Sequence, residues 1–268
     1  MIQAYRMFML RLSCALLCLA ATPLLCAQTM QTGFGFVTSI SGSVQAQSKD
    51  GQARNFSLHQ NQALDGIKIE SGPEDSLILV LSNGVALAIT ENTQVEFNTF
   101  KQIPFDPDSN TIQYEPTVSD LQIHLIQGTV ALSCDHISPL SNLKIKMQDG
   151  HLRVHSTTSV LSVNPIGMQV SAYQGTLTYH YPNGTEREFI ANPQSIRISQ
   201  QSAIRGIVTE STNVDTQAHR HQNLAAAVDF ARSRVIYRSV PDETFPQPHL
   251  LVPENYLAQK PVRPYSFK

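Results

Sequence analysis

Hydrophobic and polar positions alternate with a period of two along most of the chain between residues 34 and 198. Short runs rich in Val, Ile, Leu and Thr are separated by turn-forming residues, and none keeps the periodicity of a helix. Branched side chains favour strands because they pack well on a pleated surface. The pattern predicts an all-β body.

Turn signals place hairpins within this body. Asn83-Gly84 separates the apolar runs 76–82 and 85–90, and both residues tolerate the positive φ that a tight hairpin turn requires. The other predicted hairpins pair 35–44 with 53–58, 121–126 with 129–132, 143–147 with 151–155, and 169–181 with 186–190, and 195–199 is expected to be the closing strand.

A short pattern with a central glycine recurs three times. Residues 126–130 read IQGTV, residues 173–177 read YQGTL, and residues 40–44 read ISGSV. A glycine at the same place in each copy predicts a bend or bulge. Such a repeat suits either the stacked turns of a β-solenoid or the two layers of a β-sandwich, and the pattern leaves both open.

The segment 100–116 carries three prolines and several turn formers, so it predicts a surface excursion between two β lobes, 28–100 and 117–200. The next segment, 216–240, is predicted to be helical because residues 223–237 read NLAAAVDFARSRVIY. Its apolar residues recur on one stripe, formed by Leu224, Val228, Ala231 and Val235.

The last segment, 241–268, contains six prolines between aromatic and aliphatic residues, which predicts an extended or disordered tail. An extended tail with large apolar side chains is a candidate interface for another protein. The alternative is that it packs on its own domain or has no fixed structure. The candidate interface residues are Phe245, Leu250, Leu251, Tyr256 and Tyr265.

Two arginines precede an apolar run at 12–25, and the small residue Ala27 follows it. This order predicts an export signal over residues 1–27 and a mature chain in the periplasm or outside the cell. The run is shorter than the roughly 20 apolar residues of a spanning helix and contains Pro23. An uncleaved anchor is the alternative, and no membrane span is expected in the mature chain.

The chain carries 19 basic and 21 acidic residues without long runs, for a net charge of −2. This balance gives no electrostatic footprint for nucleic acid or acidic membranes, and neither is expected as a partner. Three of the four cysteines lie within residues 1–27, which leaves Cys134 without an internal partner. Its thiol is expected to be buried or to pair between chains.

Residues 35–44 follow a Gly-x-Val-x-x-Ile-x-Gly-x-Val pattern, residues 58–72 include Leu58, Gln62, Leu64 and Gly66, and residues 76–84 read SLILVLSNG. In these three segments the first part of the β body resembles the extracytoplasmic domain of the FecR family. Asn61 stands where the family usually has Gly, and its Arg-Gly-Thr motif is absent from the second lobe. The resemblance implies a protein-interaction module without catalytic residues. It also implies that signalling would need a separate membrane partner.

Candidate chemistry is sparse. His151 and His155 have the spacing of metal ligands on a helix, but on a strand they would lie about 13 Å apart. His219 and His221 are a second candidate pair without a nearby acidic or cysteine ligand. In Cys134-Asp135-His136, adjacent side chains point to different sides and rarely form a nucleophile and base.

Residues 106–110 resemble the start of a calcium loop but lack its distal glutamate, so a surface loop is expected there. No catalytic, cofactor-binding or metal-binding residue is assigned, and no cofactor is expected. The sequence predicts a non-enzymatic exported protein that binds an envelope protein or small ligand or serves as a scaffold.

One alternative is a component of transmembrane signalling of the FecR type. Another is an envelope enzyme or carbohydrate-binding β protein, in which four histidines would converge on a cleft: His124, His136, His151 and His155.

Overall fold

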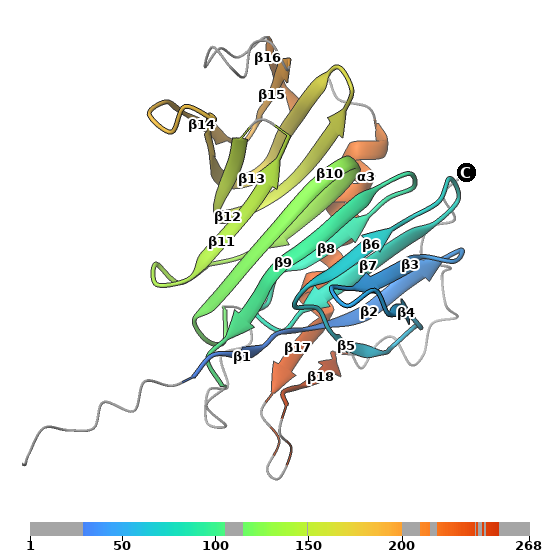
Figure 1. Cartoon of the computed structure of the whole chain (residues 1–268). Helices are drawn as coiled ribbons and strands as arrows, with labels where there is room; N and C mark the ends of the chain where they lie inside the picture. The colour runs from blue at the N-terminus through green and yellow to red at the C-terminus, as the bar shows by residue number, and fades with distance from the viewer. Residues whose placement is uncertain are drawn as a thin grey trace, which may run out of the picture.

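The computed structural model describes residues 29–104, 115–148, 150–199, 210–214, 219–238, 240, 243 and 245–251. The expected export signal, the loop at 106–110 and two tail residues, Tyr256 and Tyr265, lie outside these ranges. Within them, sixteen strands join into one sheet, followed by a helix and a separate two-stranded sheet (Figure 1). The predicted all-β fold class with a helix after the β body is confirmed.

The large sheet folds over into two layers, as in a β-sandwich. The first layer has the order β16 (Glu210–Asn213), β15 (Gln194–Ser199), β13 (Gly167–His180), β12 (Gly150–Asn164), β10 (Ser119–Cys134), β8 (Ala86–Ile89), β7 (Ser76–Leu81), β2 (Phe34–Ser41) and β5 (Asn61–Ala63). The second has the order β14 (Arg187–Ala191), β13, β12, β11 (Asn142–Met147), β10, β9 (Gln94–Gln102), β6 (Ile67–Glu70), β3 (Gln45–Ser48) and β4 (Ala53–Asn55), and β1 (Gln31–Thr32) also pairs with β9.

Three long strands, β10, β12 and β13, contribute to both layers. The first part of β10 pairs with β9 and β11, whereas the part from Gly128 onward pairs with β12 and β8. β13 pairs with β15 before Gly175 and with β14 after it. Both glycines have positive φ, 92° and 66°, and Gly42, with φ 72°, lies between β2 of one layer and β3 of the other. The predicted glycine bends are confirmed, and each accompanies a change of layer.

Two predicted elements are wrong. Residues 121–132 form no hairpin around Gly128 but belong to the single strand β10, with a register shift against β9 between Leu125 and Gln127. Gly128 is therefore a bulge within a strand and not a turn. The strand predicted over 35–44 ends at Ser41, and only its continuation in β3 pairs with β4.

The other predicted hairpins are confirmed. β7 and β8 pair from Leu77 with Ile89 to Val80 with Ala86. β11 pairs with β12, and β13 pairs with β14. β15 pairs with β13 as expected, but β16 lies beyond it, so β15 is not the last strand of the layer.

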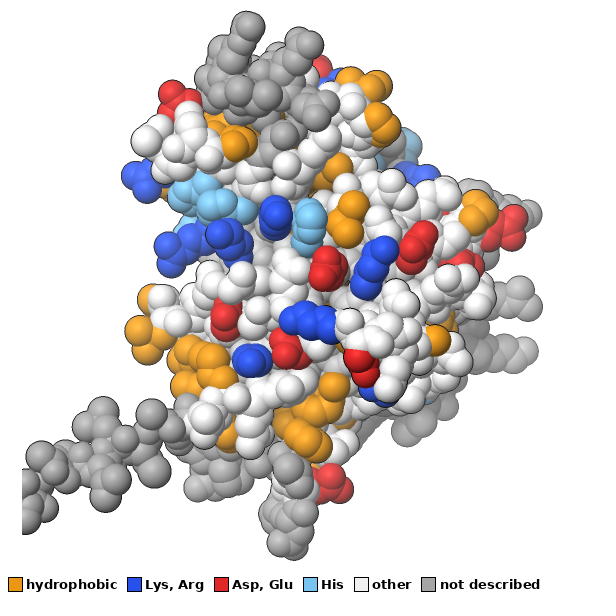
Figure 2. All heavy atoms as spheres, viewed as in Figure 1, with side chains coloured by type: hydrophobic (Ala, Val, Ile, Leu, Met, Phe, Trp, Pro, Cys, Tyr) orange, Lys and Arg blue, Asp and Glu red, His pale blue; other side chains and the backbone are white. Residues whose placement is uncertain are grey.

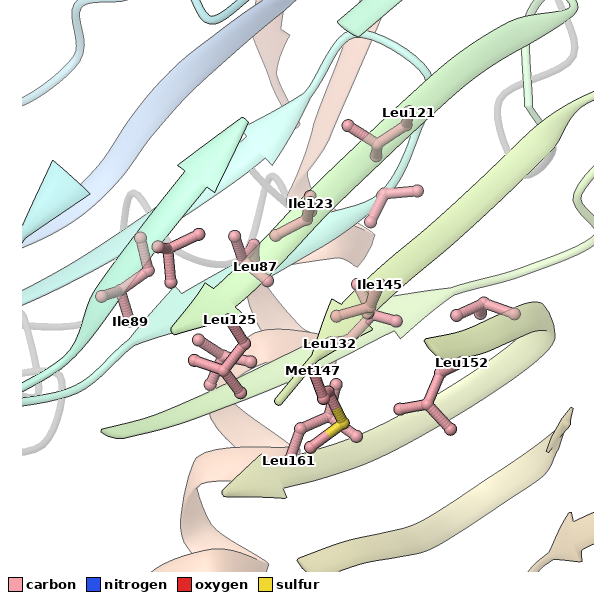
Figure 3. Packing of buried hydrophobic residues seen from close by; sticks show 14 of the residues in the cluster. Leu87, Ile89, Leu121, Ile123, Leu125, Leu132, Ile145, Met147, Leu152 and Leu161 are labelled. Carbon is pink, nitrogen blue, oxygen red and sulfur yellow. The ribbon is translucent and has the colours of Figure 1, made fainter. Parts of the chain in front are cut away.

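One hydrophobic core fills the space between the layers (Figure 3). It extends from Val37 to Ile198 and takes side chains from strands on both sides of segment 100–116. Leu87 of β8 lies opposite Leu132 of β10, and both are fully buried, as is Leu161 of β12. Each such side chain stabilises the fold by about 1.5–3 kcal/mol relative to exposure.

Helix α3 (His219–Arg234) covers the outer face of the first layer. Its predicted apolar stripe is buried on small side chains of the sheet, among them Ala86, Ala88 and Ala131, which allow a close approach. The helix ends at Arg234, before the end of both the predicted segment 216–240 and its run 223–237, because Val235, Ile236 and Tyr237 belong to β17 (Val235–Arg238), paired with β18 (Gln247–Leu250). Branched and aromatic residues favour this strand.

Candidate binding face

The outer face of the second layer is open in the part of the chain that the structure describes. α3 lies behind the sheet in Figure 1, on the other layer, and none of the described elements crosses β9 to β14 in front. Alternation along these strands places apolar side chains in the core and polar ones on this open face. The second layer therefore presents a broad polar surface.

Five side chains form a row across this face. The registers place Arg187 opposite His180, His180 opposite His151, His151 opposite Lys146, and Lys146 opposite His124. The row crosses five strands, from β14 to β10. Since neighbouring strands are about 4.8 Å apart, it is about 19 Å long.

A second group lies beside this row, two residues or about 7 Å along the strands. Lys144 lies opposite Arg153, and His155 follows Arg153 on the same side of β12. Figure 2 shows histidine, lysine and arginine side chains gathered on this face. Together they form the histidine-cation face, made of His124, Lys144, Lys146, His151, Arg153, His155, His180 and Arg187.

The rings of His151 and His180 are stacked, with centroids 4.8 Å apart and an angle of 6° between their planes. The Nε2 atom of His155 lies 3.3 Å from the hydroxyl oxygen of Thr178. His151 and His180 are half-buried, and His155 is more exposed. The face thus places three imidazoles on two neighbouring strands.

The surroundings lower the pKa of every histidine on this face. Burial, with the charges of Lys144 and His180, lowers the pKa of His151 to about 4. Burial lowers the pKa of His180 too, assisted by Arg187, Arg153 and Lys144. Burial and then the neighbouring cations therefore favour the neutral form of both imidazoles.

The two outer histidines follow the same rule. Burial and then Arg153 and His180 lower the pKa of His155. Burial and Lys146 lower that of His124, while Glu96 acts in the opposite direction. Glu96 lies opposite His124 in register, at the end of the row. The charge of the face is thus positive from β11 to β14 and becomes mixed at β9.

A shallow groove of about 270 Å³ continues the face toward its edge at β3, β4 and β6. Lys68 of this groove lies opposite Glu96, which links the groove to the row. Its polar lining consists of Ser43, Gln45, Gln47, Arg54, Asn55, Lys68 and Glu70. The groove therefore offers hydrogen-bonding groups of both signs rather than a cationic surface.

The face is suited to binding anions. Lysine and arginine attract carboxylate, phosphate or sulfate groups, and neutral imidazoles add hydrogen-bond donors and acceptors. Among the described residues, no group of three or more His, Cys, Asp or Glu side chains is placed to hold a metal ion.

The histidines singled out from the sequence are separated in part. His124, His151 and His155 lie on the open face, whereas His136 lies in the loop after β10 with its Nδ1 atom 2.5 Å from a carboxylate oxygen of Asp135. His151 and His155 belong to a strand, as predicted. The four do not converge on one cleft.

The Cys134 thiol is buried in the core, and this burial raises its pKa to about 12. His136 faces Asp135 instead of the thiol. Cys134-Asp135-His136 is therefore not arranged as a nucleophile with its base. At the start of α3, His221 is half-buried and its pKa is lowered by burial and by Arg220.

The described part of the tail contacts its own domain. The ring of Phe245 lies 4.8 Å from that of Phe34, centroid to centroid. The amide of Leu251 donates a hydrogen bond of 2.7 Å to the carbonyl of Arg234. Leu250 is 42% exposed on β18. Tyr256 and Tyr265 lie outside the described residues.

Sequence reasoning missed five members of the face: Lys144, Lys146, His180, Arg153 and Arg187. They alternate with buried apolar residues, which marked their strands as half-exposed. That alternation does not tell which strands are neighbours in the sheet or in what register they pair.

No family model and no curated protein matches this chain. Two crystal structures of a putative anti-sigma factor from Parabacteroides distasonis are similar to it, at 9% and 11% identity and TM-scores of 0.40 and 0.42. Each match covers 71% of this chain and 87% of the other. Scores this low carry no argument about function, and the resemblance to FecR domains stays a prediction.

None of the helices in the described residues has both the length and the apolar character needed to cross a membrane.

Proposed function

We propose that this chain is a non-enzymatic binding module of the bacterial cell envelope that binds an acidic segment of a partner protein on its histidine-cation face. The observation that supports this is the row from Arg187 to His124, which presents basic side chains across five strands. Arg187 and Lys146 in this row are exposed and available to a partner.

The spacing of the face suits an extended peptide. Alternate side chains of an extended chain point the same way and lie about 7 Å apart, close to the separation between the row and the Lys144–Arg153 pair. Acidic residues at alternate positions can therefore meet both groups of cations. Exposed charge pairs of this kind contribute about 0.2–1 kcal/mol each, so several are needed for stable binding.

The net charge of −2 does not oppose this function. Attraction between charged surfaces acts over about 8–10 Å at physiological salt, so the local charge of the face matters more than the total. Complementary charges also accelerate encounter and select the partner. Binding through this face is therefore expected to weaken as salt rises.

The envelope location rests on the export signal expected at residues 1–27, and the absence of an assigned catalytic group rests on the sequence and on the FecR resemblance. A signalling component of the FecR type would bind its membrane partner with the same module. That alternative rests on the resemblance and stays a prediction.

The test is binding of a fluorescent peptide of alternating Asp and Ser to the purified protein, with an Asn-Ser peptide as the neutral control. Lys146→Glu with Arg187→Glu is expected to weaken binding about tenfold or more, through the loss and reversal of two charges. Arg197→Glu on β15 with Arg238→Glu on β17 makes the same change in net charge away from the face and is expected to bind nearly as the wild type does.

Equal losses in the two double variants would show that net charge, and not this face, governs binding. A sulfated polysaccharide such as heparin provides a second comparison. If heparin binds the face and the Asp-Ser peptide does not, the proposal of an acidic protein partner is wrong.

A further inference from the structure

The stacked pair of His151 and His180 has an uncommon environment for two titratable groups. They lie directly opposite each other on β12 and β13, with their ring centroids 4.8 Å apart. In register beyond them lie Lys146 on β11 and Arg187 on β14. The pair is thus enclosed by basic residues at both ends.

The groups that face this pair come from every neighbouring strand of the layer. Two acidic residues, Glu186 and Glu188, lie close to Tyr181. Burial raises the pKa of Tyr181 most, and the charges of these two residues raise it further. The groups around the pair are Lys144 and Lys146 on β11, Arg153 and His155 on β12, and Arg187 on β14.

Among the described residues, none of the charges that act on the pair is negative. Burial disfavours the protonated form of either ring, and the other ring and several neighbouring cations disfavour it further. A bound anion would supply the opposite charge that the neighbouring strands do not. The protonated form would then be favoured over the neutral one.

We propose, on the basis of the function proposed above, that the face binds its acidic partner with uptake of a proton by the His151–His180 pair, so that binding is tighter in mildly acidic than in neutral surroundings. The ligand group is a carboxylate of the partner. A hydronium ion or buffer acid in the solvent gives up this proton, which forms an N–H bond on one of the two imidazoles, and no other covalent bond changes.

The geometry allows one carboxylate to contact both rings. With ring centres 4.8 Å apart, its two oxygens can each accept a hydrogen bond of about 2.8 Å from a different imidazole. Thermodynamic linkage then acts in both directions. Protonation of the pair strengthens binding of the carboxylate, and binding of the carboxylate raises the pKa of the pair by the same free energy.

The test is isothermal titration calorimetry of the Asp-Ser peptide in two buffers that differ in ionisation enthalpy. Aspartate has an ordinary pKa of about 3.9, so the peptide remains charged between pH 7.5 and pH 5.5. We expect net proton uptake on binding and an affinity that rises about threefold or more from pH 7.5 to pH 5.5. The upper limit is a tenfold rise per pH unit, which uptake of one full proton would give.

His151→Gln with His180→Gln is expected to abolish the proton uptake and most of the pH dependence, because glutamine keeps hydrogen-bonding capacity but does not titrate. The matched control is His136→Gln with His249→Gln, two histidines outside the face, which should behave as wild type. An NMR titration of the ring protons of His151 and His180 gives an independent result, since peptide should raise their pKa.

The outcomes separate the two proposals. Peptide binding that is lost in Lys146→Glu/Arg187→Glu, but shows no proton uptake and no pH dependence, contradicts the proton linkage and leaves the proposed function intact. Absence of peptide binding to the wild type at both pH values contradicts the proposed function. An unchanged pKa of both rings on saturation with peptide also contradicts the linkage.

Discussion

The hydroxyl group of Ser133 on β10 donates a hydrogen bond of 2.8 Å to a carboxylate oxygen of Asp229 on α3. Arg232, one turn further along the helix, donates from Nε to the same hydroxyl oxygen at 3.0 Å and lies 3.3 Å from the Asp229 carboxylate. These contacts join α3 to the sheet beside the buried apolar stripe of the helix.

Asp229→Ala is therefore expected to lower the free energy of unfolding by about 1 kcal/mol, below the roughly 1.5–3 kcal/mol of a hydrogen bond to a charged group because the site is partly exposed. Urea denaturation measures the change. Ser233→Ala, whose hydroxyl bonds only within the exposed side of α3, is the control and should stay within about 0.5 kcal/mol of wild type. A similar loss in both variants would mean that the sheet contact contributes nothing.

Gly175 carries a second prediction because it combines positive φ with close packing. Its φ is 66°, and a Cβ atom there would lie 1.9 Å from the carbonyl oxygen of Ser156. Gly175→Ala should lower the free energy of unfolding by about 3 kcal/mol or more, because backbone strain and a backbone clash add together.

Gly184 is the matched control for this substitution. Its φ is 73°, but no atom lies within 4 Å of the place that the methyl group of an alanine would occupy. Gly184→Ala should therefore cost only the strain, about 1 kcal/mol. Chemical denaturation of both variants separates the backbone strain from the clash. Equal losses of stability would show that the close approach of β12 and β13 is not the reason for a glycine at position 175.

The histidines of the face predict how stability depends on pH. Their pKa values in the folded protein lie below the ordinary value, with that of His151 at about 4. The unfolded chain therefore binds more protons as the pH falls below about 6.5, and stability is lost progressively toward pH 4. Above about 6.5 both states are neutral at these positions and their contribution is fully present.

Thermal unfolding between pH 7 and pH 4.5 tests this direction. The melting temperature of the wild type should fall on acidification, and His151→Gln should reduce the fall because glutamine does not titrate. His249→Gln on β18 is the control with one fewer histidine elsewhere. A wild-type melting temperature that rises on acidification would contradict the lowered pKa values.

Cys134 should be chemically inert in the folded state. Its thiol is buried, and burial raises its pKa to about 12, so the reactive thiolate is nearly absent at pH 8. In a chain carrying Cys14→Ser, Cys18→Ser and Cys26→Ser, iodoacetamide should label almost no protein until denaturant is added. Rapid labelling without denaturant would show that the thiol is accessible.

Local features of the sequence were sufficient for most elements. The hairpin of β7 and β8 followed from Asn83-Gly84 between two apolar runs, because a turn and its strands are neighbours in the chain. The buried stripe of α3 likewise followed from the spacing of Leu224, Val228 and Ala231. These patterns depend on backbone geometry over a few residues.

The tertiary structure decided how the elements combine. Gly128 could be a turn or a bulge by sequence, and it became a bulge because the parts of β10 on either side of it pair with different strands. The histidine-cation face arose in the same way, since Lys146, His151, His180 and Arg187 come from four strands. The sequence by itself determined which side chains point outward, whereas packing of the core set the register that placed them in one row.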